Sequence, residues 1–140
     1  MADRNVRIIR KNGKKPVIKE FTKTASTALD KNSLVALSSG KLVATADNDT
    51  NCLGIILEEV ASTDSDYAST TVKQVEVIQP GDEVEITTSA AATPGVSYGV
   101  SNAYTVDVTD TTNDLFTCTK AISSTKAIGY IKSYQGGNTV

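Results

Sequence analysis

The chain alternates short apolar runs with polar turns, and no stretch keeps a helical period for three turns. Residues 71–78 show the alternation most clearly, with Val75 and Val77 on one face and Gln74 and Glu76 on the other. Turn signals such as the Gln-Pro-Gly-Asp run at 79–82 separate the apolar runs. Strands are predicted at 6–10, 17–21, 34–37, 41–45, 53–57, 71–78, 83–87, 96–100, 104–108, 115–119 and 127–134, with a short helical turn at 90–93.

Many short strands at this spacing predict an all-β fold, either a small β-barrel or a sandwich. The composition agrees, because the chain has 13 serines and 19 threonines, many valines and few long helix formers. Small hydroxyl and β-branched residues favour strands and turns over helices. A length of 140 residues fits a single folded body.

A weak internal repeat accompanies the strands. Residues 31–47 resemble residues 94–110, since each has an apolar strand, a serine-containing turn, a second strand and then an aspartate. Residues 52–56 likewise resemble residues 127–131, each with a central glycine, which predicts a bulge or a close backbone approach. The glycines expected to shape turns and close approaches are Gly40, Gly54, Gly81, Gly95 and Gly129.

The net charge of −2 hides an asymmetry along the chain. Residues 1–23 carry a net charge of +6, and the remaining residues carry −8. Such a split predicts a basic arm on an acidic body. We therefore expect an extended N-terminal arm at 1–28, a β-barrel body at 29–135 and a flexible tail at 136–140.

The arm is predicted either as a hairpin around Asn12-Gly13 or as an extended segment that orders only on a partner. Its only aromatic residue is Phe21, which disfavours nucleic-acid binding by base stacking. Its apolar residues favour strand addition to a partner's sheet edge, steered by the basic charges. The residues expected to contact the partner are Arg7, Ile8, Ile9, Arg10, Val17 and Ile18.

Candidate catalytic chemistry is sparse. The chain has no histidine, so neither a Ser-His nor a Cys-His couple can form. The adjacent carboxylates Glu58/Glu59 and Asp82/Glu83 would point to opposite faces of a strand. The expectation is a protein that is not an enzyme and uses no cofactor. Cys52 and Cys118 fit apolar gaps, and the sequence leaves their pairing open.

The run from Asp47 to Asn51 places oxygen ligands at alternating positions, like the start of a calcium loop. Cys52 stands where such a loop needs its glycine, so an ordinary Asp/Asn turn is favoured. A second acidic loop at 107–114 has the same interpretation. No apolar leader or membrane-length run is present, so synthesis in a cytoplasm and no membrane partner are expected.

Three stretches resemble bacteriophage head decoration proteins, the capsid cement proteins of the lambda type. They are SLVALSSGKLVATADNDTNCLGIIL at 33–57, VEVIQPGDEVEI at 75–86 and SAAATPGVSYGV at 89–100. The resemblance implies a β-tulip-like barrel, often a homotrimer, whose partner is the major capsid protein. It would bind the outer surface of the expanded head, made in a bacterial host, and stabilise the virion against internal genome pressure.

The alternative function is a carbohydrate- or cell-surface-binding β module of a phage tail or fibre. A sugar-stacking face would need exposed aromatic residues, but stacking sites prefer tryptophan and this chain has none. Core edges and interfaces are therefore the favoured places for the tyrosines, which are Tyr67, Tyr98, Tyr104, Tyr130 and Tyr134.

Overall fold

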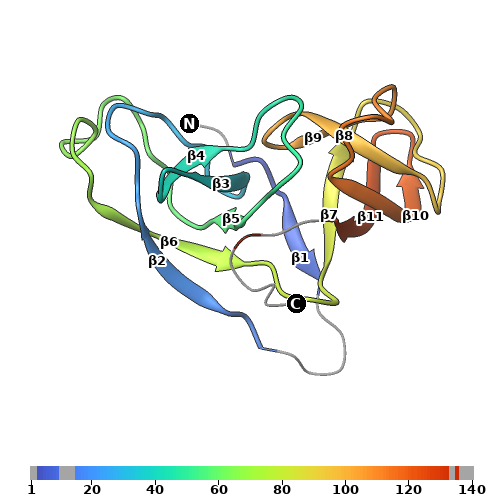
Figure 1. Ribbon diagram of the computed structural model, residues 1–140, viewed down its shortest axis with the longest axis horizontal. Coiled ribbons are helices and arrows are strands. Elements are labelled where there is room, and N and C mark those ends of the chain that lie inside the picture. Colours follow the sequence, from blue (N-terminus) through green and yellow to red (C-terminus); the bar gives the residue numbers. More distant parts are fainter. Residues whose placement is uncertain (1–2, 10–14, 133–134, 136–140) are drawn as a thin grey trace.

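The computed structural model describes residues 3–9, 15–132 and 135, and within them it contains only strands, turns and loops (Figure 1). The predicted all-β fold is confirmed. The predicted helical turn at 90–93 is wrong, since these residues form an irregular loop in which Ala92 is buried and Thr93 donates its backbone N–H to the Tyr98 hydroxyl (3.0 Å). The strands are β1 (Arg7–Ile9), β2 (Ile18–Thr22), β3 (Leu34–Ser38), β4 (Lys41–Ala44), β5 (Gly54–Ile56), β6 (Val72–Val77), β7 (Glu83–Thr88), β8 (Ser97–Asn102), β9 (Thr105–Asp107), β10 (Phe116–Ser123) and β11 (Lys126–Ile131).

The strands form two sheets, here called unit 1 (β2–β6) and unit 2 (β7–β11). Unit 2 has the order β7-β11-β10-β8-β9 and closes into a barrel because β9 also pairs with β7 in parallel. Unit 1 has the order β2-β6-β5-β3-β4, and its two ends meet at a single parallel bridge between Lys23 and Leu42. β1 adds to unit 2 beside β7 (Figure 1).

The two units have the same topology, because adding five to each strand number of unit 1 gives the order of unit 2. The register matches as well. β5 sets Gly54 opposite Val77 of β6, and β10 sets Phe116 opposite Ile131 of β11 at the corresponding place. The preceding turns also correspond, since Asn32 N–H donates to the Ile56 carbonyl and Gly95 N–H donates to the Cys118 carbonyl, both at 2.8 Å.

This correspondence differs in part from the one drawn from sequence. The hairpin β3–β4 does match β8–β9, as residues 31–47 and 94–110 indicated. The residues around Gly54, however, belong to β5, whose equivalent is β10, whereas Gly129 lies in β11. A central glycine does not mark equivalent strands here, because Gly54 and Gly129 each avoid a different close contact. A Cβ at Gly54 would meet the backbone of Glu76, and one at Gly129 would meet the carbonyl of Thr117.

Two hydrophobic cores hold the fold together. The smaller core fills unit 1, and the larger core fills unit 2 and extends to the junction between the units. Strands β3 and β5 serve both, since Leu34 and Ile55 face the larger core while Val35 and Ile56 face the smaller one. Successive residues of a strand point to opposite faces. A strand buried on both faces therefore has a continuous apolar run, as these two have.

Three of the five turn and contact glycines have the left-handed backbone that favours glycine: φ is 78° at Gly40, 88° at Gly81 and 88° at Gly95. Ser39 and Gly40 form the two-residue loop of the β3–β4 hairpin, and both have positive φ. Two positive φ angles define the type I′ turn, whose twist matches that of the strands it joins.

Candidate partner-binding surface

The basic N-terminal segment does not form a hairpin with itself. β1 joins unit 2 and β2 joins unit 1, so residues 3–9 and 15–23 contribute to both sheets. β2 lies at the outer margin of the molecule, and the picture shows no strand on its outer side (Figure 1). Arg10 lies outside the described residues.

β1 is held on β7 by packing and by charge. Val6 is buried and Ile8 packs against the larger core. Arg7 donates to the Glu85 carboxylate (2.8 Å), and the Lys126 ammonium lies 3.6 Å from the same carboxylate. These contacts explain why Arg7 and Ile8, both expected to face a partner, serve the protein's own sheet.

The segment before β1 is fixed by a second cluster that the sequence did not reveal. The Arg4 guanidinium bonds to Asp30 (2.6 Å) and lies 3.8 Å from the centre of the Tyr104 ring. A guanidinium over an aromatic face is attracted by the ring's negative face. The partners are 26 and 100 positions away along the chain, so no local pattern pointed to them.

The Glu85 carboxylate makes β1 sensitive to acid. The hydrogen bond from Arg7 lowers the pKa of Glu85 below its ordinary value of 4.5, and the charges of Arg7 and Lys126 act in the same direction. A lowered pKa in the folded state stabilises the protein above pH 4.5, and this stability is lost as the pH falls through the lowered pKa. We expect urea denaturation of Arg7→Gln to depend less on pH below 4.5 than wild type. Equal slopes in the two proteins would contradict this assignment.

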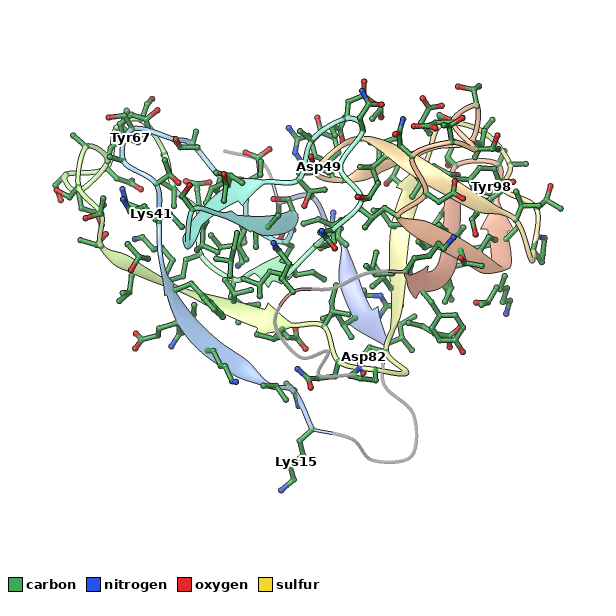
Figure 2. All side chains as sticks on the ribbon, in the orientation of Figure 1. Lys15, Lys41, Asp49, Tyr67, Asp82 and Tyr98 are labelled. Carbon is green, nitrogen blue, oxygen red and sulfur yellow. The ribbon has the colours of Figure 1, made fainter. Side chains whose placement is uncertain are left out.

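β2 has one inner and one outer face. Val17 and Phe21 pack against the smaller core. Ile18 lies on the other face and is 51% exposed, which makes it one of the most exposed large apolar residues in the described chain. Lys15, at the lower end of β2 in Figure 2, and Lys19 are also exposed. The edge of β2 thus combines an exposed aliphatic side chain with basic neighbours.

Lys23, the last basic residue of the segment, is fully buried. Its ammonium donates to the backbone carbonyls of Tyr67 (2.9 Å) and Ser69 (2.5 Å) and thereby fixes the loop between β5 and β6. Its backbone N–H donates to the Thr71 carbonyl (2.9 Å). Lys23 is therefore a structural residue of unit 1 and does not belong to a solvated arm.

The two acidic loops contact each other. Asn113 of the second loop donates its side-chain amide to the side-chain oxygen of Asn48 in the first (2.8 Å). The Asp49 carboxylate accepts the Ala46 backbone N–H (2.8 Å), and the Asp110 carboxylate accepts those of Thr112 and Asn113. The bond from Thr112 to Asp110 is that of an ordinary Asx turn, and the bond from Ala46 to Asp49 closes the first loop. The described residues contain no group of three metal-ligating side chains.

The adjacent carboxylates are likewise used to fix loops and strands. Glu58 accepts the Gln74 backbone N–H (2.7 Å), and Asp82 accepts that of Gln79 (2.9 Å). Glu83 accepts the Thr119 hydroxyl (2.7 Å). Glu58, Asp82 and Glu83 thus each have a structural partner.

The tyrosines of the described residues are dispersed over both units. Tyr98 is buried, and Tyr67 donates its hydroxyl to the Ser26 carbonyl (2.9 Å) at the opposite end of the molecule (Figure 2). Arg4 covers the ring of Tyr104. Tyr130 is 42% exposed on β11. Tyr134 lies outside the described residues. The four described tyrosines do not combine into one stacking face.

Both cysteines are free thiols buried in the larger core. Burial raises the pKa of Cys52 to about 12 and also raises the pKa of Cys118. Because the thiolate is the reactive form, native protein at pH 8 should react with a disulfide reagent far more slowly than urea-unfolded protein. Fast labelling of two thiols in the native protein would contradict the buried placement.

Comparison with models of known protein families and with curated proteins gave no match. Over residues 3–9, 15–132 and 135, no helix is long and apolar enough to cross a membrane.

Proposed function

We propose that the protein is a capsid decoration protein, which binds the outside of an expanded phage head and stabilises it. The single observation that carries the proposal is the edge of β2, where Ile18 is 51% exposed beside Lys15 and Lys19. An unpaired edge with an exposed aliphatic residue is a site for strand addition, and basic neighbours steer it to an acidic surface. The resemblance to capsid cement proteins supplies the class of partner, the major capsid protein.

The stabilising effect would follow from mass action. A protein that binds only the expanded shell lowers the free energy of that state. Many copies on one shell add up as avidity, even where each contact is weak. A homotrimer on a three-fold axis would place three β2 edges on three neighbouring capsid subunits. The homotrimer and the location on the outer surface of the virion are parts of the same proposal.

Substitutions test the role of the basic segment better than a deletion does. Deleting residues 1–23 would also remove β2 and the buried Lys23 from unit 1, so loss of binding would be ambiguous. The double substitution Lys15→Glu with Ile18→Ser alters only exposed side chains. We expect it to weaken binding to expanded shells at least tenfold without changing thermal stability. Ile122→Ser, at a 46% exposed residue of β10, is the matched control.

Wild-type binding by the double variant would rule out the β2 edge as the capsid contact. A cell-surface module, the alternative function, would bind immobilised glycans instead. A glycan array with wild-type protein separates these two classes.

A further inference from the structure

The correspondence between the two units reveals one position that a strand fills in unit 2 and that no described residue fills in unit 1. In unit 2, β1 pairs with the first half of β7, and β9 pairs with its second half. In unit 1, the strand equivalent to β7 is β2. The described residues place a neighbour only near its C-terminal end, where Lys23 bridges to Leu42.

The equivalence of β2 and β7 is fixed residue by residue. β2 pairs with β6 so that Ile18 faces Glu76, and β7 pairs with β11 so that Glu83 faces Tyr130. Glu76 and Tyr130 are themselves equivalent, because they face Ile55 of β5 and Thr117 of β10. The residues Ile18, Lys19 and Glu20 therefore correspond to Glu83, Val84 and Glu85, the three residues that β1 covers.

The backbone of β2 has N–H and C=O groups at this position that the described part of the chain leaves unbonded. Val17 accepts the Val77 N–H (2.8 Å), and Lys23 donates to the Thr71 carbonyl (2.9 Å), so the odd-numbered residues bond to β6. In an antiparallel ladder the intervening residues point the other way. The N–H and C=O groups of Ile18 and Glu20 thus face the open side, and no described residue bonds to them.

The side chains of β2 indicate what kind of segment would pair with this edge. In unit 2, Arg7 of β1 bonds to Glu85 at 2.8 Å. Unit 1 keeps the acid at this place, since Glu20 is exposed and has no ion-pair partner among the described residues. Ile18 offers an apolar contact two positions away. Side chains directly opposite each other in an antiparallel pair share a face and interact.

Lys19, the middle residue of the three, makes this edge fit a segment of another protein better than a second copy of β1. Where unit 2 has Val84 opposite Ile8, unit 1 has the exposed Lys19. A lysine at a strand edge opposes pairing with an apolar strand, which is a common protection against self-association. An acidic residue opposite Lys19 would turn this obstacle into an ion pair.

We infer that the open edge of β2 binds an extended segment of a partner protein with the pattern basic–acidic–aliphatic. The segment runs antiparallel to β2, with its basic residue opposite Glu20, its acidic residue opposite Lys19 and its aliphatic residue opposite Ile18. This inference concerns the same edge as the capsid proposal but does not need it. A partner segment can bind here even if the protein never binds a shell.

The test uses the full-length protein labelled with ¹⁵N and two synthetic peptides. One has the sequence of residues 4–10, RNVRIIR, and the other, RNVREIR, has glutamate in place of the first isoleucine, at the position of Ile8. We expect RNVREIR to bind with one-to-one stoichiometry, to shift the amide signals of Ile18 and Glu20 most, and to bind at least threefold more tightly than RNVRIIR. Tighter binding of RNVRIIR would overturn the assignment in favour of a second copy of the chain.

Charge exchange provides the control. Glu20→Arg should weaken RNVREIR at least tenfold, and the peptide RNVEEIR, in which the arginine opposite position 20 is glutamate, should bind this variant more tightly than it binds wild type. Asp47→Arg makes the same charge change on an exposed loop residue and should leave binding unchanged. Equal effects of Glu20→Arg and Asp47→Arg, or no binding at millimolar peptide, would overturn the inference. Because no shell is present, this result is independent of the shell-binding experiment.

Discussion

Replacing Lys23 with alanine is expected to destabilise the protein by about 3 kcal/mol. The side chain is fully buried, and its ammonium donates to the carbonyls of Tyr67 and Ser69. Truncation removes both bonds and leaves a cavity where the aliphatic stem was. Hydrogen bonds from a charged group contribute more than those between neutral groups. The midpoint of urea denaturation measures the loss.

Two further variants separate the contributions of the stem and the ammonium. Lys23→Met keeps most of the volume and removes the charge, so we expect a smaller loss than with alanine. Lys41→Ala, at an exposed lysine of β4, is the control and should change stability by less than about 0.5 kcal/mol. An unchanged midpoint for Lys23→Ala would show that the ammonium and its carbonyl partners contribute nothing to unit 1.

Replacing Gly129 with alanine is expected to destabilise the protein by about 3 kcal/mol or more, because the new methyl group has no room. A Cβ at this place would meet the carbonyl of Thr117 on β10, and it would lie 2.6 Å from the Phe116 ring. Backbone atoms of a paired strand cannot move aside without breaking the ladder between β10 and β11. Lys120→Ala, at an exposed residue of β10, is the matched control.

Thermal unfolding followed by circular dichroism measures this effect. We expect Gly129→Ala to melt well below wild type and Lys120→Ala to melt close to it. A wild-type melting temperature for Gly129→Ala would mean that β10 and β11 lie farther apart than the structure places them.

The strands could be predicted from the sequence because alternation is a local signal. Val75 and Val77 face the core and Gln74 is exposed, as their spacing indicated. The β3–β4 hairpin was equally predictable, since its turn needs the positive φ of Ser39 and Gly40. Local sequence thus contains most of the information on which residues extend and where the chain turns.

The partners of the strands could not be predicted, because pairing is decided by contacts between distant segments. β1 and β2 are close in the sequence but join different sheets, where each finds apolar residues to cover. Along the sequence, Lys23 is one more positive charge of the basic arm, because the carbonyls that bind it lie 44 and 46 positions later. Two of the six predicted contact residues, Ile8 and Val17, pack against the protein's own cores for the same reason.

The most direct test of the decoration proposal is a co-sedimentation experiment with expanded, undecorated phage shells and increasing amounts of purified protein. The proposal predicts that bound protein reaches a plateau at a fixed number of copies for each three-fold axis, and that the Lys15→Glu/Ile18→Ser variant falls short of this plateau at the same concentrations. Protein that stays in the supernatant at every concentration would contradict the decoration function.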